Sequence, residues 1–275
     1  MVRSTHWLGL AAFSVRGAVL AGDYDGSPQV AEFIVEMTRD HGFAGEQLVS
    51  LFSQAERKQA ILDAISRPAE KVKPWKDYRP IFITEARISK GVDFWNQNAE
   101  ALARAEKEYG VPAQVIVAII GVETFYGGNT GSWRGLDALS TLCFDYPPRA
   151  EFFCQQLREL LLLSREEQID PITLTGSYAG AMGLPQFMPG SFRAYAVDFD
   201  GDNHINIWSN PVDAIGSVAS YFKRHGWVAG EPVVSRAQVK GELVDSGLTQ
   251  GLDPVKNVGE LRALGWSSAD VLRDD

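Results

Sequence analysis

The chain contains 275 residues, of which 45% are hydrophobic and 22% are charged, and this composition indicates a globular protein of one or two domains. Its 26 Lys and Arg residues against 35 Asp and Glu residues give a net charge of −9. Such an acidic chain argues against nucleic acid and anionic lipid as partners, because phosphate binding is built from clustered Lys and Arg. The 7 Trp and 8 Tyr residues suit either core packing or a carbohydrate groove. The two cysteines, Cys143 and Cys154, exclude a disulfide-rich scaffold and a four-cysteine zinc site but leave their pairing open.

Residues 1–23 have the pattern of an export leader. Arg3 precedes an apolar run over residues 7–15, and the small residues Ala21 and Gly22 follow after Leu20. Position 23 is Asp rather than the Cys that would carry a lipid, so we expect no stable membrane anchor. The pattern predicts a soluble protein of the periplasm or cell envelope, and the alternative interpretation is a disordered start of the chain.

Residues 24–88 are predicted to form a helical domain that flanks the main core. Apolar residues recur at helical spacing after residue 30, and the segment 53–65 repeats the pattern. The segment 74–80 combines prolines with aromatic residues and is interpreted as a linker.

Residues 89–225 are predicted to form the main helical core. An apolar stripe over 88–109 predicts one long amphipathic helix that stops at Gly110. The next helix opens at Pro112 and lacks a polar face, which predicts that it is buried all round. This helix ends in Glu123.

Glu123 lies next to a predicted helix C-terminus, where the negative end of the helix dipole disfavours a carboxylate. The apolar helix, Phe125 and Tyr126 are expected to exclude water from it, which has the same effect. Both effects raise the pKa, and a carboxylic acid that is protonated near neutral pH suits general acid catalysis at a glycosidic oxygen. The alternative is a surface glutamate paired with an arginine.

The segment 177–189 is rich in small residues, which would let a ligand approach the backbone closely. Ser177 and Gln186 supply hydroxyl and amide groups suited to the hydroxyl and N-acetyl groups of sugars. The alternative is a tight corner between packed helices.

Three motifs occur in order along the chain: Gly121-Val122-Glu123-Thr124, the segment 177–189, and the segment 214–219 followed by Tyr221-Phe222 and His225-Gly226-Trp227. Together they resemble the membrane-bound lytic transglycosylase B family from about residue 24 to the C-terminus. The resemblance implies a mainly α (α+β) fold with a lysozyme-like helical core, a helical flanking domain and a small β domain. It also implies cleavage of the β-1,4 bond between N-acetylmuramic acid and N-acetylglucosamine in the glycan strands of peptidoglycan.

The resemblance assigns catalysis to one residue, Glu123, which would donate a proton to the leaving oxygen and then accept one from the substrate's C6 hydroxyl. Attack of that hydroxyl on the anomeric carbon would give 1,6-anhydromuramic ends without water, so no second carboxylate is required. Ser177 would also hold or orient the Glu123 carboxyl. The substrate-binding residues that the resemblance implies are Ser177, Gln186, Tyr221, Phe187 and Phe152.

Two alternative functions stay open. A hydrolytic muramidase would need a carboxylate placed to activate water, and no motif supplies an evident one. A non-catalytic glycan-binding scaffold stabilised by calcium would bind the same strands without depending on the acid at Glu123.

Oxygen-bearing residues alternate in the segment 198–213 and match the calcium loop of an EF-hand. The match covers loop positions 1, 3, 5, 7 and 9, which are Asp198, Asp200, Asp202, His204 and Asn206. Asn203 replaces the glycine of position 6 and Ser209 replaces the glutamate of position 12, so Asp213 would close a longer loop. The resemblance supports a structural calcium site at Asp198, Asp200, Asp202, His204 and Asp213, with no organic cofactor. The alternative is an acidic turn that caps the following helix.

Residues 226–275 predict a small β-rich domain, because short apolar pieces are broken by Gly and Pro before a small helix over 258–266. Members of the family continue beyond this domain and return to the core, so we expect the chain to be C-terminally incomplete relative to them. His225 is interpreted as a helix C-terminal residue that contacts carbonyl groups.

Overall fold

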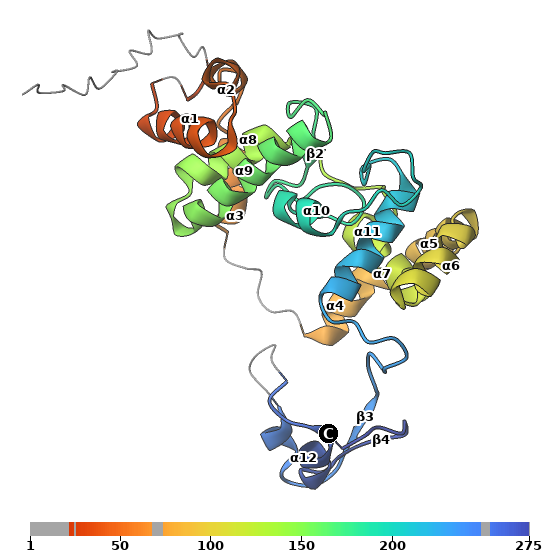
Figure 1. Ribbon diagram of the computed structural model, residues 1–275. Coiled ribbons are helices and arrows are strands. Elements are labelled where there is room, and N and C mark those ends of the chain that lie inside the picture. The colour runs from red at the N-terminus through yellow and green to blue at the C-terminus, as the bar shows by residue number, and fades with distance from the viewer. Residues whose placement is uncertain (1–21, 25, 68–73, 249–253, 275) are drawn as a thin grey trace, which may run out of the picture. The chain divides into compact units, whose positions relative to one another are not determined.

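A computed structural model describes residues 22–24, 26–67, 74–248 and 254–274 (Figure 1). The chain divides into two compact units, one that ends at Trp227 and one that begins at Val228. The predicted leader lies almost entirely outside the described residues. Within the described part of the chain, no helix combines the length and the apolar character needed to cross a membrane.

Three helices open the larger unit: α1 (Pro28–His41), α2 (Gly45–Phe52) and α3 (Gln59–Ile65). They share one hydrophobic core with α8 (Gly135–Asp145) and α9 (Ala150–Glu166), and Figure 1 shows these helices together. Edge-to-face aromatic contacts bind this core across segments far apart in the sequence. The rings involved are Tyr24, Phe33, Phe52 and Phe144.

The segment 74–80 was expected to be a linker, and this expectation is wrong because it lies largely within helix α4 (Trp75–Phe82). Pro74 occupies the N-cap, where a missing N–H costs nothing, and accepts hydrogen bonds at its carbonyl from Asp77 N (2.8 Å) and Tyr78 N (3.1 Å). Pro80 lies inside this helix of two turns, where its missing donor removes a single backbone hydrogen bond.

The single helix expected over 88–109 is two helices, α5 (Glu85–Gln97) and α6 (Ala99–Tyr109). Asn98 separates them with a non-helical backbone at φ −118° and ψ 23°. Its side-chain amide donates to Phe94 O at 2.8 Å, and this local hydrogen bond competes with continuation of the helix. An apolar stripe that runs across the break hides it from a periodicity analysis.

A second hydrophobic core lies among α5, α6, α7 (Ala113–Thr124) and α11 (Pro211–Arg224). Ile116 and Ile120 of α7 are fully buried in it. The expectation that α7 is buried all round is wrong, because Val122 is 44% exposed and Glu123 is also exposed. The helices α5, α6 and α11 contact α7 but leave the face with Val122 and Glu123 uncovered.

Two short strands and a short helix complete the larger unit. Strand β1 (Trp133–Arg134) pairs antiparallel with β2 (Thr175–Gly176), and α10 (Pro189–Tyr195) packs on α9. Cys143 of α8 and Cys154 of α9 form a disulfide across the short 3-10 helix η1 (Pro147–Arg149). The sequence left open whether these two cysteines pair, and the structure shows that they do.

The smaller unit contains β3 (Ala237–Val239), the 3-10 helix η2 (Val244–Gly247), α12 (Val258–Ala263) and β4 (Trp266–Ser268). Strands β3 and β4 pair antiparallel, with Val239 opposite Trp266. The predicted small helix is confirmed and begins with a capping box between Asn257 and Glu260, although Trp266 belongs to β4.

Candidate active site

Glu123 occupies the last turn of α7, one residue before the helix ends. Phe125 and Tyr126 follow with left-handed backbones at φ 53° and 56°, which is uncommon for non-glycine residues and turns the chain sharply. Thr124, only 1% exposed, donates through Oγ1 to Leu184 O at 2.9 Å and accepts from Gly127 N at 3.1 Å. The turn that carries Glu123 is thereby fixed to the segment 177–189.

The Tyr126 side chain lies in a slot between α5 and α7. A Cβ atom at Gly91 or at Gly121 would come within 2.4 Å of the Tyr126 hydroxyl oxygen, so both positions require glycine. Sequence analysis missed this arrangement, although a glycine within an otherwise apolar helix is a signal of close approach. The slot attaches the turn after Glu123 to a second helix.

The pKa of Glu123 is shifted in the direction that the sequence predicted. Neighbouring protein atoms partly desolvate the carboxyl, and this desolvation raises its pKa above the ordinary value for glutamate. The side chain nevertheless stays exposed to solvent. Within the described residues no N–H or O–H group donates a hydrogen bond to the carboxyl, so nothing counters the desolvation.

The segment 177–189 folds back on itself. Ser177 Oγ accepts from Ala181 N at 3.0 Å, and Met182 bridges to both Gly176 and Phe187. Gln186 has a left-handed backbone at φ 51°, and its amide donates to Thr130 O (3.1 Å) and Gly183 O (3.0 Å).

Ser177 and Gln186 are half-buried in this segment. Among the hydrogen bonds of the described residues, none joins Ser177 to Glu123. The segment is instead joined to the helix end by Thr124 and Leu184, two motif residues to which sequence analysis assigned no role.

The aromatic residues selected from the sequence lie in different environments. Tyr221 on α11 is half-buried among three rings. Its ring centroid lies 5.6 Å from that of Phe187, 5.1 Å from that of Tyr195 and 4.0 Å from that of His225. Phe187 is only 8% exposed and belongs to the hydrophobic core, so its ring offers little surface to a ligand. His225 Nδ1 lies 2.8 Å from Tyr221 O at the end of α11, which confirms its predicted contact with a helix carbonyl.

Phe152 lies apart from this aromatic cluster, on α9. It is 39% exposed, and the Arg149 guanidinium lies 4.4 Å from its ring centroid. Its neighbour Phe153, at 5.1 Å between ring centroids, is buried in the first core. Phe152 thus presents a surface ring at the N-terminal end of α9.

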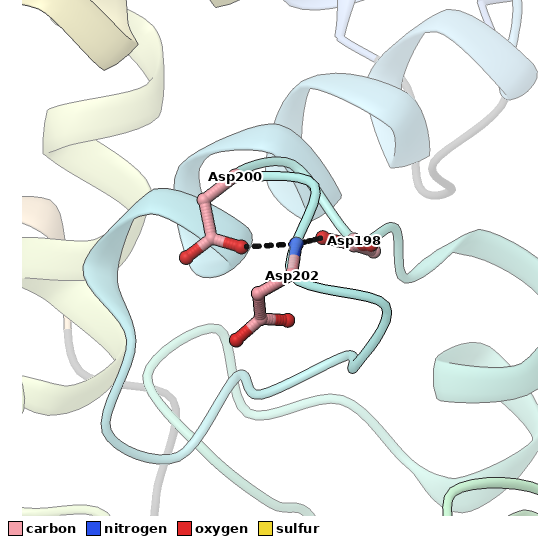
Figure 2. Close-up of side chains that lie close together, drawn as sticks. All are labelled: Asp198, Asp200 and Asp202. Atoms are coloured by element: carbon pink, nitrogen blue, oxygen red, sulfur yellow. Dashed lines mark hydrogen bonds between the residues drawn. The ribbon is translucent and has the colours of Figure 1, made fainter.

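Three of the five predicted metal ligands come together in the loop before α11. Carboxylate oxygens of Asp198, Asp200 and Asp202 lie within 4.8 Å of one another (Figure 2). Desolvation acts to raise the pKa of Asp198, but backbone N–H donors, including those of Gly201 and Asn203, outweigh it and lower the pKa. Three clustered carboxylate side chains supply oxygen donors, and such a donor set fits a hard divalent cation.

Asp213 and His204 take other places in this loop. Asp213 is fully buried and accepts hydrogen bonds from Phe199 N (2.7 Å) and Asn206 N (2.8 Å), so its carboxylate holds the two ends of the loop together. The His204 side chain lies outside the carboxylate cluster, and its backbone N–H donates to Asp202 Oδ1 at 2.8 Å. Asn203 adopts the left-handed conformation, at φ 71°, that its loop position demands.

Comparison with known proteins gives consistent matches. The family model described as a transglycosylase SLT domain matches residues 25–274. The membrane-bound lytic murein transglycosylase B of Escherichia coli (strain K12) is 48% identical over 262 residues, which cover 92% of this chain and 71% of that protein. A crystal structure of the soluble lytic transglycosylase SltB1 from Pseudomonas aeruginosa is 73% identical, with a TM-score of 0.88 over 90% of this chain and 82% of that one.

A structure of the Escherichia coli lytic transglycosylase Slt35 in complex with calcium is 47% identical, with a TM-score of 0.84 over 91% of this chain and 78% of that one. The fold and these matches place the protein in the class of lytic transglycosylase enzymes with a lysozyme-like helical core. The chain belongs to the transglycosylase SLT domain family.

Proposed function

We propose that this enzyme cleaves the glycan strands of peptidoglycan at the β-1,4 bond between N-acetylmuramic acid and N-acetylglucosamine and leaves 1,6-anhydromuramic ends. Its site of action is then the periplasmic side of the cell envelope, where such strands occur. The name of the Escherichia coli relative, a lytic murein transglycosylase, supports this substrate class.

The observation that carries the proposal is that Glu123 has a raised pKa and is exposed to solvent. Among the described carboxyl groups, Glu123 and Asp213 have raised pKa values, and both owe this to desolvation. Asp213 is fully buried and is held by backbone donors, whereas Glu123 is open to solvent. Glu123 therefore combines a raised pKa with access to a ligand, and both properties favour a general acid.

One carboxyl can serve both halves of the reaction. Glu123 donates its proton to the glycosidic oxygen as the bond to the anomeric carbon breaks. The resulting carboxylate then accepts the proton of the C6 hydroxyl as that oxygen bonds to the anomeric carbon, so the enzyme returns to its starting state. A raised pKa suits both steps, because the group must lose and regain one proton near the working pH.

The substrate contacts are assigned to side chains of the same unit. Ser177 and Gln186 offer a hydroxyl and an amide carbonyl, and the Gln186 side chain is already fixed through its NH₂ group. Tyr221 contributes a half-buried ring, with Phe187 behind it at 5.6 Å between ring centroids. Phe152 offers an exposed ring on α9 for a more distant part of the strand.

We also propose that the loop before α11 binds calcium as a structural ion. Asp198, Asp200 and Asp202 would supply side-chain oxygens, and the backbone carbonyl of His204 would occupy the seventh loop position. Asp213 would support the site from behind through its hydrogen bonds to Phe199 N and Asn206 N. The calcium complex of the Slt35 relative supports this ion.

Digestion of purified peptidoglycan tests the activity directly. The wild-type chain should release fragments whose muramic ends carry the 1,6-anhydro bond, which mass spectrometry distinguishes from reducing ends by the mass of one water. Glu123→Gln keeps the shape of the side chain and removes the acid, so it should lower the rate by about 10³-fold. Reducing muramic ends, or full activity of Glu123→Gln, would overturn the proposal.

A further inference from the structure

Two cations of α5 share one aromatic ring at the turn that follows Glu123. Arg87 and Lys90 are three residues apart on the helix and therefore lie on the same side of it. The Arg87 guanidinium carbon lies 5.2 Å, and Lys90 Nζ lies 4.8 Å, from the centroid of the Phe125 ring. Because Phe125 comes two residues after Glu123, both cations border the catalytic turn.

Neither cation has an acidic partner within the described residues. Arg87 donates through one guanidinium nitrogen to Ile81 O (3.0 Å) and Phe82 O (2.8 Å), which fixes it at the end of α4. Lys90 is half-buried, and its ring contact with Phe125 is its one recorded interaction in the described part of the chain. By contrast, Arg134, Arg158 and Arg193 of the same unit each pair with a carboxylate.

This arrangement leaves a local excess of positive charge in an acidic protein. Like charges three residues apart on a helix repel each other, and contacts with aromatic rings, Phe82 and Phe125 for Arg87 and Phe125 for Lys90, compensate the two cations only in part. The chain has 35 Asp and Glu residues, yet none of the described ones pairs with Arg87 or Lys90. An anionic group of a ligand would be attracted to both cations and would offset their mutual repulsion. Arg87 and Lys90 are therefore suited to bind such a group.

We propose that Lys90, together with Arg87, binds a carboxylate of the peptide carried by N-acetylmuramic acid while the glycan strand lies at Glu123. The inference rests on the proposed function, because such a strand brings a peptide to the catalytic turn. The sugar rings are neutral, and free carboxylates on the peptides are the anions of the strand. Lys90 supplies an ammonium on a flexible side chain, whereas Arg87 is held by hydrogen bonds to Ile81 O and Phe82 O.

The test compares two forms of one substrate with the full chain. One form is peptide-bearing glycan, and the other is the same glycan after its carboxylates have been converted to amides. The measured quantity is the ratio of kcat/KM for the charged form to that for the amidated form. Lys90→Gln should lower this ratio about three- to tenfold, and Lys90→Arg should restore it, because a charged contact to a carboxylate contributes on this scale.

The matched control is Lys107→Gln, which removes the same charge from an exposed position on α6. It should leave the ratio at the wild-type value. An unchanged ratio in Lys90→Gln, or an equal fall in Lys107→Gln, would overturn the inference. A wild-type chain that released no anhydro-ended fragments from either form would instead overturn the proposed function, so the two failures are distinguishable.

Discussion

The last turn of α7 and the loop before α11 each carry a carboxyl group, Glu123 and Asp198, whose pKa values are shifted in opposite directions. Desolvation raises the pKa of Glu123, and within the described residues no donor counters it. Around Asp198 desolvation has the same sense, but the N–H groups of Gly201, Asn203 and Asp202 outweigh it and lower the pKa. The two carboxyls therefore differ in their hydrogen-bond donors: backbone N–H groups of a tight turn lower the pKa of Asp198, whereas desolvation acts alone on Glu123.

Each region is also anchored by one buried polar side chain. Thr124 fixes the catalytic turn through Leu184 O, and Asp213 fixes the acidic loop through Phe199 N and Asn206 N. Both residues are at most 1% exposed. The difference between the regions can therefore be tested by disturbing each anchor and each group of carboxyls separately.

The largest effect is expected from Gly121→Ala. The new Cβ would meet the Tyr126 hydroxyl oxygen at 2.4 Å and Cζ at 2.6 Å, so the ring must leave its slot and the catalytic turn must shift. We expect kcat to fall about 10- to 100-fold, because small displacements of a catalytic group are costly, and stability to fall by about 1–3 kcal/mol. Rate measurements and thermal unfolding check this.

Gly45→Ala is the matched control for this change. Gly45 opens α2, and a Cβ there would have its nearest contact at an ordinary 3.6 Å from Thr38 Oγ1. It should leave kcat unchanged and slightly increase stability through its better helix propensity. Wild-type activity of Gly121→Ala would show that the slot does not position Glu123.

Thr124→Val tests the anchor of the catalytic turn. The substitution keeps the shape of the side chain but leaves Leu184 O and Gly127 N without their hydrogen-bond partner. We expect the free energy of unfolding to fall by about 1–3 kcal/mol, since an unpaired buried polar group costs this much. Denaturant unfolding measures it, and Thr124→Ser, which keeps the hydroxyl, should recover most of the loss.

Calcium binding tests the acidic loop. A ligand at ten to a hundred times its dissociation constant stabilises the folded state by about 1.4–2.7 kcal/mol, so millimolar calcium should raise the Tm by a few degrees. Asp200→Asn should weaken this response, whereas Asp93→Asn, at an exposed position of α5, should not. If the Tm of the wild-type protein were the same with calcium and with a chelator, the proposed calcium site would be wrong.

The smallest effect concerns pH and the raised pKa of Glu123. Because the folded-state pKa exceeds the unfolded-state value, the folded protein favours the protonated carboxyl. Wild-type stability should therefore decline as the pH rises from the ordinary glutamate pKa through the raised one. Glu123→Gln lacks this titration, so its Tm advantage over wild type should grow across the same window. A constant Tm difference from pH 4 to pH 8 would contradict the raised pKa.

Sequence analysis predicted the parts of the fold that depend on local patterns. The apolar run before Glu123 gave α7 and its end, and the alternating residues of 198–206 gave the carboxylate cluster, because neighbours in the chain build both features. The break at Asn98 was missed because the apolar stripe continues across it, and the helix at Trp75–Phe82 was missed because its prolines resembled a linker.

Contacts between distant segments were out of reach of the same reasoning. The residues next to Tyr126 in the sequence do not indicate that its hydroxyl lies against Gly91. Those next to Thr124 do not indicate that its hydrogen-bond partner is Leu184 O. Asp213 illustrates the same limit: its place after the acidic loop predicted a closing residue, but that spacing does not indicate the hydrogen bonds that its buried carboxylate accepts from Phe199 N and Asn206 N.

Because of the Cys143–Cys154 disulfide, the stability of the fold depends on the redox conditions of the compartment that contains the protein. The bond closes a short stretch of chain, with a separation of 11 residues, and a loop of this length reduces the entropy of the unfolded chain by an amount worth about 3 kcal/mol. That gain exists only in an oxidising compartment such as the periplasm. In a reducing cytosol the same sequence would lack the crosslink between α8 and α9 and would unfold more readily, so redox conditions set the stability of the first core.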